Sequence, residues 1–352
     1  MEYYFLYRVI RFSFIACGAL LLLSSCTAVS YYTQSIVGHS SLMLSRKPIE
    51  KVLKGVDETL KQQLLTAVEI RQFATSELGL PDNQSYTSYV QLKNDPPIWN
   101  VIAAEEFSLR GKQWCYPVIG CAGYRGYYHR EDADKYAKKI EEEGYEIHLS
   151  SATAYSTLGW FDDPLTSAMF KRGDASLAEL VFHELAHQQL YVKGDSRFNE
   201  AFASAVGEQG AIRWLRMTNR NVMLDKYQQR QEVRDDFINL INEAKAKLKI
   251  IYGSKKTVDR KRKEKQKVFS NMRQKHESLI EKKWGGKKWY ALWFSQPINN
   301  ARLVAISTYR DLVPDFVGLF QRCGEDFSLF YGNVKRVSAE ERRDLNVECS
   351  LL

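Results

Sequence analysis

Three patterns of apolar and polar positions follow one another along the chain. Residues 12–23 are almost wholly apolar. In residues 58–78 apolar positions recur every three or four residues, which predicts an amphipathic helix. From residue 97 onward, short apolar runs separated by glycine and proline predict strands, and residues 226–283 are again helical but highly charged. We therefore expect an α+β fold that includes a long, charged α-helical hairpin.

The predicted strands come directly before the most informative stretch of the chain. They cover residues 98–107, 113–119, 124–128, 145–149 and 154–161, with a charged helix over 130–143. We expect them to form one small mixed sheet. Its edge is assigned to Ser156–Phe161, where an extended peptide could pair with the sheet, although a plain core strand fits these residues equally well.

The stretch His183–His187 has the sequence His-Glu-Leu-Ala-His on a predicted helix. Residues four apart lie on one face of a helix, so both imidazoles can reach one metal ion. Glu184 follows the first histidine, where it can approach a metal-bound water. The neighbouring positions are apolar, and polar groups on a partly buried helix need partners because unpaired burial is costly. This pattern favours a zinc site over two solvated histidines.

Glu200 is the expected third ligand, thirteen residues beyond the second histidine. A catalytic zinc usually takes three protein ligands and leaves a fourth position for water. A glycine is expected to end the first helix, and Asp195 or Ser196 to cap a second one. Small residues over 201–207 would allow the two helices to pack closely. A three-histidine site would need histidine at position 193, where the chain has Lys193.

The expected chemistry of such a site is metal-assisted hydrolysis of a peptide bond. Zinc would polarise the carbonyl and lower the pKa of a water to about 7, and Glu184 would act as the general base. A second donor to the developing oxyanion is also expected. Spacing does not choose among its candidates, which are Tyr155, Tyr309 and His129. Asp162 and Asp163 are candidates for binding a substrate amine, although a solvated turn fits them better.

The first residues carry the signals of export. Arg8 and Arg11 precede an apolar run that is too short to span a bilayer. The run ends in Leu23–Cys26, whose sequence Leu-Ser-Ser-Cys resembles the lipobox of bacterial lipoproteins, and Thr27 resembles the pattern sent to the outer membrane. We expect a bacterial envelope protein that is anchored through lipidated Cys26 and faces the periplasm. A plain secretory signal is the alternative.

Export changes how the other cysteines and the charges are interpreted. Cys115 and Cys121 bracket a short turn and are predicted to form a disulfide, whereas Cys323 and Cys349 fit a second disulfide and free thiols about equally. The 352 residues carry a net charge of +8, yet residues 211–290 hold 23 Lys and Arg against 9 Asp and Glu. Because an exported protein meets no nucleic acid, we expect a solvated helical arm, or one that contacts anionic lipid.

Several blocks of the sequence resemble one family along nearly the whole mature chain. They are residues 114–121, 124–127, 155–164, 183–188 and 198–200, and Asn300-Ala301 with Tyr309. These blocks resemble the bacterial "putative aminopeptidase" family of zinc lipoproteins with an HExxH motif. The resemblance implies a zinc peptidase with a gluzincin-like site. One position departs from the gluzincin pattern, since Ser204 stands where those enzymes carry an aspartate that orients a histidine ligand.

The predictions combine into one domain plan and one function. The plan is a signal peptide (1–25), an N-terminal helical segment (26–96), a zincin-like catalytic core (97–225), the charged hairpin (226–286) and a C-terminal helical segment on the core (287–352). We expect a zinc-dependent envelope aminopeptidase acting on peptide or protein substrates. An envelope endopeptidase with the same site is the nearest alternative. A non-catalytic metal-binding scaffold is another, but it gives Glu184 no role. The sequence does not indicate an oligomeric state.

Overall fold

A computed structural model describes residues 31–92, 98–116, 120–152, 162–307, 312–340 and 343–350. The chain divides into two units, residues 1–46 and Lys47–Leu352. In the first unit, residues 31–45 form a helix, and the expected signal peptide with Cys26 lies outside the described residues. Within the described ranges, no helix has both the length and the hydrophobicity needed to cross a bilayer.

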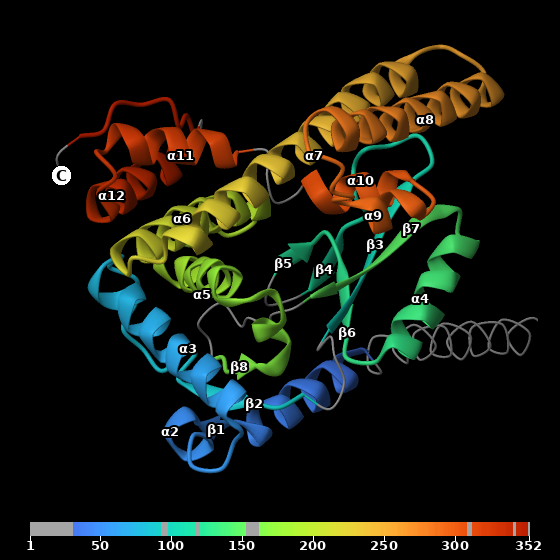
Figure 1. Cartoon of the computed structure of the whole chain (residues 1–352). Helices are drawn as coiled ribbons and strands as arrows, with labels where there is room; N and C mark the ends of the chain where they lie inside the picture. Colours follow the sequence, from blue (N-terminus) through green and yellow to red (C-terminus); the bar gives the residue numbers. More distant parts are fainter. Residues whose placement is uncertain are drawn as a thin grey trace, which may run out of the picture. The chain divides into compact units, whose positions relative to one another are not determined.

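The second unit contains most of the secondary structure (Figure 1). Its helices are α2 (Ile49–Val52), α3 (Glu58–Ser76), α4 (Arg130–Glu142), the short 3₁₀ helix η1 (Ser167–Arg172), α5 (Asp174–Gln189), α6 (Ser196–Met217), α7 (Asn221–Gly253), α8 (Val258–Lys282), α9 (Ala291–Ser295), α10 (Asn300–Ser307), α11 (Val313–Arg322) and α12 (Phe327–Ser338). Its strands are β1 (Lys47–Pro48), β2 (Ser88–Val90), β3 (Ile98–Glu105), β4 (Trp114–Tyr116), β5 (Gly120–Ala122), β6 (Arg125–Tyr127), β7 (Tyr145–Ala152) and β8 (Leu165–Thr166).

The described strands form three small sheets rather than the one sheet that was expected. The strand order is β6-β3-β7 in the largest sheet, β1-β2-β8 in another, and β4-β5 form a hairpin. Only β2 and β8 pair in parallel among these strands. The hairpin is separate because β4 and β5 are three-residue strands that pair with each other across the disulfide between Cys115 and Cys121. The predicted edge strand Ser156–Phe161 lies outside the described residues.

The two faces of β3 are covered by different helices, because alternate residues of a strand point to opposite faces. Ala103 and the Ile140 side chain of α4 belong to one buried cluster. Ile102 and Ala104 pack with α10 on the other face. The sheet β6-β3-β7 is therefore the middle layer of a helix–sheet–helix arrangement.

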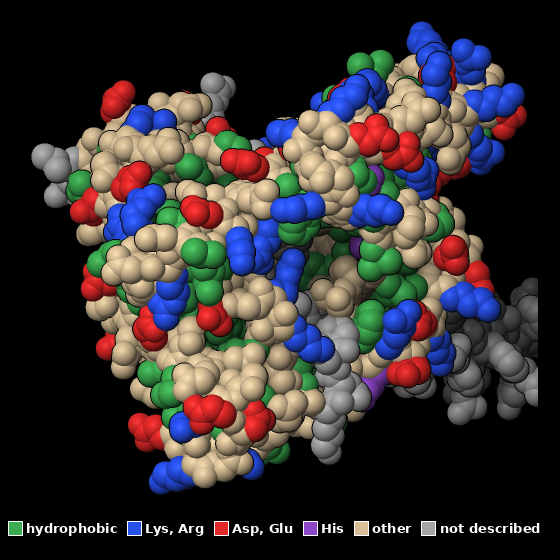
Figure 2. Space-filling model, viewed as in Figure 1, with side chains coloured by type: hydrophobic (Ala, Val, Ile, Leu, Met, Phe, Trp, Pro, Cys, Tyr) green, Lys and Arg blue, Asp and Glu red, His purple; other side chains and the backbone are tan. Residues whose placement is uncertain are grey.

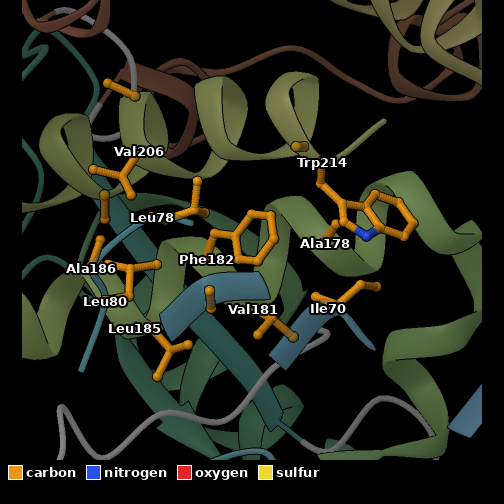
Figure 3. Close-up of a cluster of buried hydrophobic side chains, with 14 of the residues drawn as sticks. Ile70, Leu78, Leu80, Ala178, Val181, Phe182, Leu185, Ala186, Val206 and Trp214 are labelled. Carbon is orange, nitrogen blue, oxygen red and sulfur yellow. The ribbon is translucent and has the colours of Figure 1, made fainter. Parts of the chain in front are cut away.

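The main core surrounds α5, which lies between α3 and α6 (Figure 1). Phe182 and Leu185 of α5 are both 0% exposed. Figure 3 shows Phe182 beside Leu78, with Ile70 and Trp214 in the same apolar cluster. Burying one such side chain typically contributes about 1.5–3 kcal/mol. The helix that carries the HExxH motif is thus buried in the main core of the second unit.

Helices α5 and α6 approach so closely because α6 has glycine at the crossing point. A Cβ atom on Gly207 would lie 2.6 Å from the carbonyl oxygen of Glu179 and 3.2 Å from the Cβ atom of His183. Gly210, one turn further along, meets the Phe182 ring, where an added Cβ would lie 2.8 Å away. The small residues expected in this helix therefore do permit the contact, and they set the distance between the two helices.

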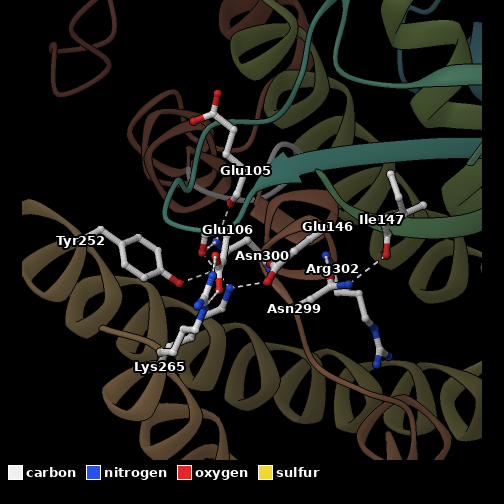
Figure 4. A network of polar contacts seen from close by, with 10 residues as sticks. Glu105, Glu106, Glu146, Ile147, Tyr252, Lys265, Asn299, Asn300 and Arg302 are labelled. Carbon is white, nitrogen blue, oxygen red and sulfur yellow. Dashed lines mark hydrogen bonds and ion pairs between the residues drawn. The ribbon is translucent and has the colours of Figure 1, made fainter. Parts of the chain in front are cut away.

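Helices α7 and α8 lie side by side, and polar contacts hold their junction to the sheet (Figures 1 and 4). The buried side chain of Asn300 donates to the carbonyl oxygens of Glu105 and Glu106, each at 2.9 Å, and accepts from Tyr252 Oη at 2.8 Å. Lys265, which is 3% exposed, donates to the Glu106 carbonyl oxygen at 2.8 Å and forms an ion pair with Glu146. Part of the expected solvated arm is therefore a packed element of the second unit.

The last described residues form the helices α11 and α12, and the sequence pattern did not predict α12. Helix α11 begins at Val313 with a proline in its first turn, and α12 ends at Ser338. Phe202 of α6 stacks on Phe330 of α12 at a ring distance of 5.9 Å. A disulfide joins Cys323, after α11, to Cys349 near the end of the chain. These contacts fix the C-terminal helices on the outer side of α6.

Candidate metal centre

Helix α5 carries the HExxH residues and begins at Asp174 after Gly173, whose φ of 81° suits glycine. In the sequence, Ser176 and Glu179 also fit a capping box, which would start the helix at Ser176. The Glu179 carboxylate instead accepts hydrogen bonds from Tyr227 Oη at 2.9 Å and from Arg234 at 2.8 Å. A long-range ion pair has replaced the local cap, because it satisfies the carboxylate in a part-buried site.

The start of α6 is fixed by two side chains just ahead of Glu200. Asp195 caps the helix, since its carboxylate accepts from the Phe198 N–H at 3.0 Å. Asn199 accepts from the Val192 N–H and donates to the Val192 carbonyl oxygen, both at 2.8 Å. The turn between the helices is thereby tied to the first turn of α6. This arrangement positions the Glu200 side chain toward α5.

The three predicted ligands lie together. The Nε2 atoms of His183 and His187 are 3.2 Å apart, and Glu200 Oε2 lies 3.4 Å from the first and 3.7 Å from the second. Ligand atoms at about 2.1 Å from a tetrahedral zinc are about 3.4 Å from one another. The triangle therefore has the size that a small tetrahedral ion requires. Among the described residues, these three side chains are also the group of His, Cys, Asp and Glu that lie close enough together to hold a metal.

The triad is buried on one side and open on the other. The side chain of His187 is 4% exposed, whereas those of His183 and Glu200 are 19% and 24% exposed. A ligand or substrate can therefore reach the site past His183 and Glu200. Within the described part of the chain, Nδ1 of His187 is buried without a hydrogen-bond partner, and Ser204 supplies none. The orienting contact that a gluzincin aspartate would make is thus not made by the residue at that position.

Charge within the triad prepares it for a cation. Burial raises the pKa of the Glu200 carboxyl, but hydrogen bonds from His183 and His187 outweigh this and lower the pKa to about 2. Burial lowers the pKa of His183, whereas its hydrogen bond to Glu200 and the charge of Glu184 raise it, with a net rise. Glu200 is therefore ionised at neutral pH, which is the form that binds metal.

A cavity of about 370 Å³ opens beside the triad and includes the predicted general base. His183 and Glu184 line one end of it, and η1, α7 and the segment before α9 supply its other walls. Figure 2 shows lysine and arginine side chains gathered around a hollow on the face in view. A larger cavity, of about 660 Å³, lies between α12 and the end of α5, and none of the triad lines it. The smaller cavity is the one that adjoins the chemistry.

The remaining site candidates are not gathered at this cavity. His129 is exposed at the start of α4 and does not line the cavity. Tyr155 and Tyr309 lie outside the described residues. Asp163 is 0% exposed, and its carbonyl oxygen accepts from the Tyr86 N–H at 2.7 Å. A fully buried residue is part of the packing rather than an anchor for a substrate amine, and Asp162 does not line the cavity either.

Sequence reasoning missed the ion pairs that join α7 to the two helices of the site. Arg234 lies 2.8 Å from Glu179 of α5 and 2.8 Å from Glu208 of α6. Burial lowers the pKa of Arg234, but the two carboxylates outweigh it and raise the pKa further. Glu208 is 6% exposed, so its charge depends on this partner. The signal in the sequence was one acidic residue on each of the two predicted helices of the site, Glu179 and Glu208. Their common partner Arg234 lies in the stretch that was assigned to a solvated arm.

Fold and site together define an α+β protein with a candidate metal centre of two histidines and one glutamate. Residues 30–346 match the family described as "Putative aminopeptidase", so the chain belongs to this family. The match includes the triad and both helices of the hairpin. No curated protein and no solved structure matches the chain.

Proposed function

We propose that this protein is a zinc-dependent peptidase of the bacterial cell envelope that acts as an aminopeptidase. The observation that carries the proposal is the triangle of His183, His187 and Glu200, with Glu184 beside it at the end of a cavity. Membership of an aminopeptidase family supports hydrolysis of peptides from their amino ends. The donor set of two imidazoles and one carboxylate fits zinc, which commonly takes nitrogen and oxygen ligands at tetrahedral spacing.

The roles of the residues follow from their positions. His183, His187 and Glu200 would hold the ion, and bound zinc would polarise the scissile carbonyl and lower the pKa of a water. Glu184 would take the proton of that water on its carboxylate and pass it to the departing amine. Glu184 can do this because it lines the cavity next to His183, which belongs to the triad. The buried side of the triad at His187 excludes solvent from behind the site.

An endopeptidase with the same triad is a second candidate, and one observation favours it. An aminopeptidase needs an acidic group for the substrate amine. In the described lining of the cavity the carboxylates are Glu179 and Glu184, and Glu179 is already bound by Tyr227 and Arg234. Cleavage within a chain would need no such amine contact.

The location in the envelope is the third part of the proposal. It rests on the lipobox-like sequence ending in Cys26 and on two disulfides, which an oxidising compartment allows. We propose that lipidated Cys26 anchors the protein in the outer membrane, facing the periplasm. Labelled fatty acid should enter the wild type and not Cys26→Ala. Incorporation that is equal in both proteins would exclude this anchor.

The experiment that tests the activity compares the wild type with Glu184→Gln, which keeps the size of the side chain and removes its basicity. Zinc content should be equal in the two proteins, while kcat/KM on free-amine peptides should fall by about 10²–10⁴-fold. The matched control is Glu77→Gln, an exposed glutamate after α3. Unchanged hydrolysis in Glu184→Gln would exclude the mechanism. Equal rates on free-amine and N-acetylated peptides would exclude the aminopeptidase and leave the endopeptidase.

A further inference from the structure

The cavity beside the triad extends well beyond Glu184. Along α5 its lining includes Ser176, Leu180 and Glu184, which are spaced by four residues and therefore share one face of the helix. Helix α7 faces them with Arg230 and Arg234, which are also four residues apart. Side chains of α5 and α7 therefore border one trough, and His183 of the triad lines it together with Glu184.

The charges in this trough do not cancel. Arg234 is neutralised by Glu179 and Glu208, each 2.8 Å away. Arg172, at the end of η1, and Arg230 are exposed and line the cavity, and neither forms an ion pair or a side-chain hydrogen bond with another residue that the structure describes. The trough thus presents two arginines without carboxylate partners among the described residues.

The segment before α9, which also lines the trough at Trp289 and Tyr290, is fixed by its contacts. Tyr290 has a φ of 59°, which is uncommon for a bulky side chain. Its ring stacks on Phe237 of α7 with centroids 3.9 Å apart and an interplanar angle of 6°. The carbonyl oxygen of the preceding Trp289 is 2.7 Å from Nε2 of the buried His276. Backbone strain of this kind persists where the surroundings fix it, and it occurs often at binding sites.

We propose that the trough is a specificity pocket for a carboxylate of the peptide substrate, which Arg172 and Arg230 bind. This inference rests on the proposed peptidase function and adds the class of substrate. A guanidinium matches a carboxylate through two parallel hydrogen bonds, and it is suited to sites that select planar anions. The carboxylate can belong to an Asp or Glu side chain or to the C-terminus of the peptide, because both present the same group.

The length of the trough limits where that carboxylate lies in the substrate. From Ser176 to Glu184 the helix rises about 12 Å. An extended peptide advances about 3.3 Å per residue. The selected carboxylate is therefore expected within about three residues of the scissile bond.

Equilibrium binding to zinc-loaded Glu184→Gln tests this inference without requiring turnover. Fluorescently labelled peptides of one neutral sequence would carry Glu or Gln at each of three positions on either side of the bond, with a C-terminal acid or amide. For one of these positions, or for the C-terminus, the peptide with the carboxylate should bind at least about tenfold more tightly than its uncharged counterpart. The ratio of the two dissociation constants should approach one when Arg172→Gln or Arg230→Gln is added. It should persist with Arg216→Gln, a change of an exposed arginine on α6 outside the trough.

The outcomes separate the two proposals. Equal binding of every charged and uncharged pair would overturn the pocket, even if the enzyme hydrolyses peptides. A charge preference that depends on Arg172 or Arg230, without hydrolysis by the wild type, would support the pocket and overturn the peptidase. Arg230→Glu provides a second test, since it should weaken the binding of acidic peptides and strengthen the binding of the same peptide with Lys at the selected position. Thermal unfolding shows whether each variant is folded.

Discussion

Asn199 binds the turn ahead of it through both backbone polar groups of one residue, since it accepts from the N–H of Val192 and donates to the carbonyl oxygen of Val192, each at 2.8 Å. Asn199 is 1% exposed and directly precedes the predicted ligand Glu200. An amide side chain has one donor group and one acceptor, so it can copy the pairing of a β-strand. The position of Glu200 relative to the histidines therefore depends on its neighbour in the sequence.

Asn199→Ala should weaken zinc binding by at least about tenfold, because removing a hydrogen bond that orients a metal ligand typically changes metal affinity by this amount. The measurement is competition for zinc with a chromogenic chelator. Asn333→Ala is the matched control, since Asn333 is also buried and hydrogen-bonded but lies on α12. It should lower the melting temperature and leave zinc affinity unchanged. Equal zinc affinity in the two variants would show that Asn199 does not position the ligand.

Glu200→Ala should reduce zinc affinity far more than Glu69→Ala does. Both carboxylates form ion pairs, but Glu69 binds Arg220 at 2.7 Å on the surface of α3, outside the triad. Zinc retained after dialysis, measured by mass spectrometry, checks this expectation. Similar zinc content in the two variants would remove Glu200 from the ligand set.

Gly207→Ala should destabilise the protein by several kcal/mol and lower its zinc affinity. The new Cβ would lie 2.6 Å from the Glu179 carbonyl oxygen, so α6 must move away from α5, and overpacking typically costs about 1–3 kcal/mol or more. Gly318→Ala on α11 is the control, because its Cβ would meet only the end of the Arg322 side chain, at 3.3 Å. That change should be neutral or stabilising by up to about 1 kcal/mol. Equal changes in the free energy of unfolding for Gly207→Ala and Gly318→Ala, measured with urea, would contradict the close approach of α5 and α6.

His148 on β7 should make the protein less stable in mild acid. Burial and, to a smaller extent, the charge of Arg302 together lower the pKa of His148 from 6.5 to about 4. Between these two pH values the unfolded chain binds the proton more readily, so stability is complete above pH 6.5 and falls as the pH drops toward 4. The loss is at most about 3 kcal/mol. His148→Gln should flatten the unfolding free energy over this range, and an unchanged slope would exclude His148 as its source.

Removing each of the two disulfides should lower the free energy of unfolding by a different amount. The pair Cys323–Cys349 closes a loop with a separation of 26 residues, and Cys115–Cys121 closes one of 6. The chain-entropy relation assigns about 3–4 kcal/mol to the longer loop and about 2–3 kcal/mol to the shorter. Double serine variants of each pair, compared by urea unfolding, test the order. Peptide mapping without reductant checks the pairing itself.

The triad was predictable because its signals are local. His183 and His187 are one helical turn apart, and the cap at Asp195 places Glu200 in the first two turns of α6. A pattern of this kind depends on helix geometry, which a short sequence determines. The sequence left Asp195 and Ser196 as alternative caps, and the hydrogen bond to Phe198 selects Asp195.

Contacts between distant residues were not predictable. Glu179 looked like half of a capping box because only its near neighbours are visible in the sequence, whereas its partner Arg234 is 55 residues away. The expected single sheet failed for a related reason, since no local pattern specifies that β4 pairs with β5 rather than with the sheet β6-β3-β7. Helix α12 was not predicted, although its apolar residues Phe327, Phe330 and Val334 recur every three or four positions and pack with α6 and α11 in the main core.

Helix α7 connects the substrate trough to the far end of the hairpin without a break. Arg230 and Arg234 stand near its beginning, and the chain turns into α8 only after Gly253. That span is about 30 Å of continuous helix. Near its far end Tyr252 is hydrogen-bonded to Asn300, and near its beginning Arg234 is paired with Glu179 and Glu208. Helix α7 is therefore a brace between the two helices of the triad and the layer of α10 and the sheet β6-β3-β7.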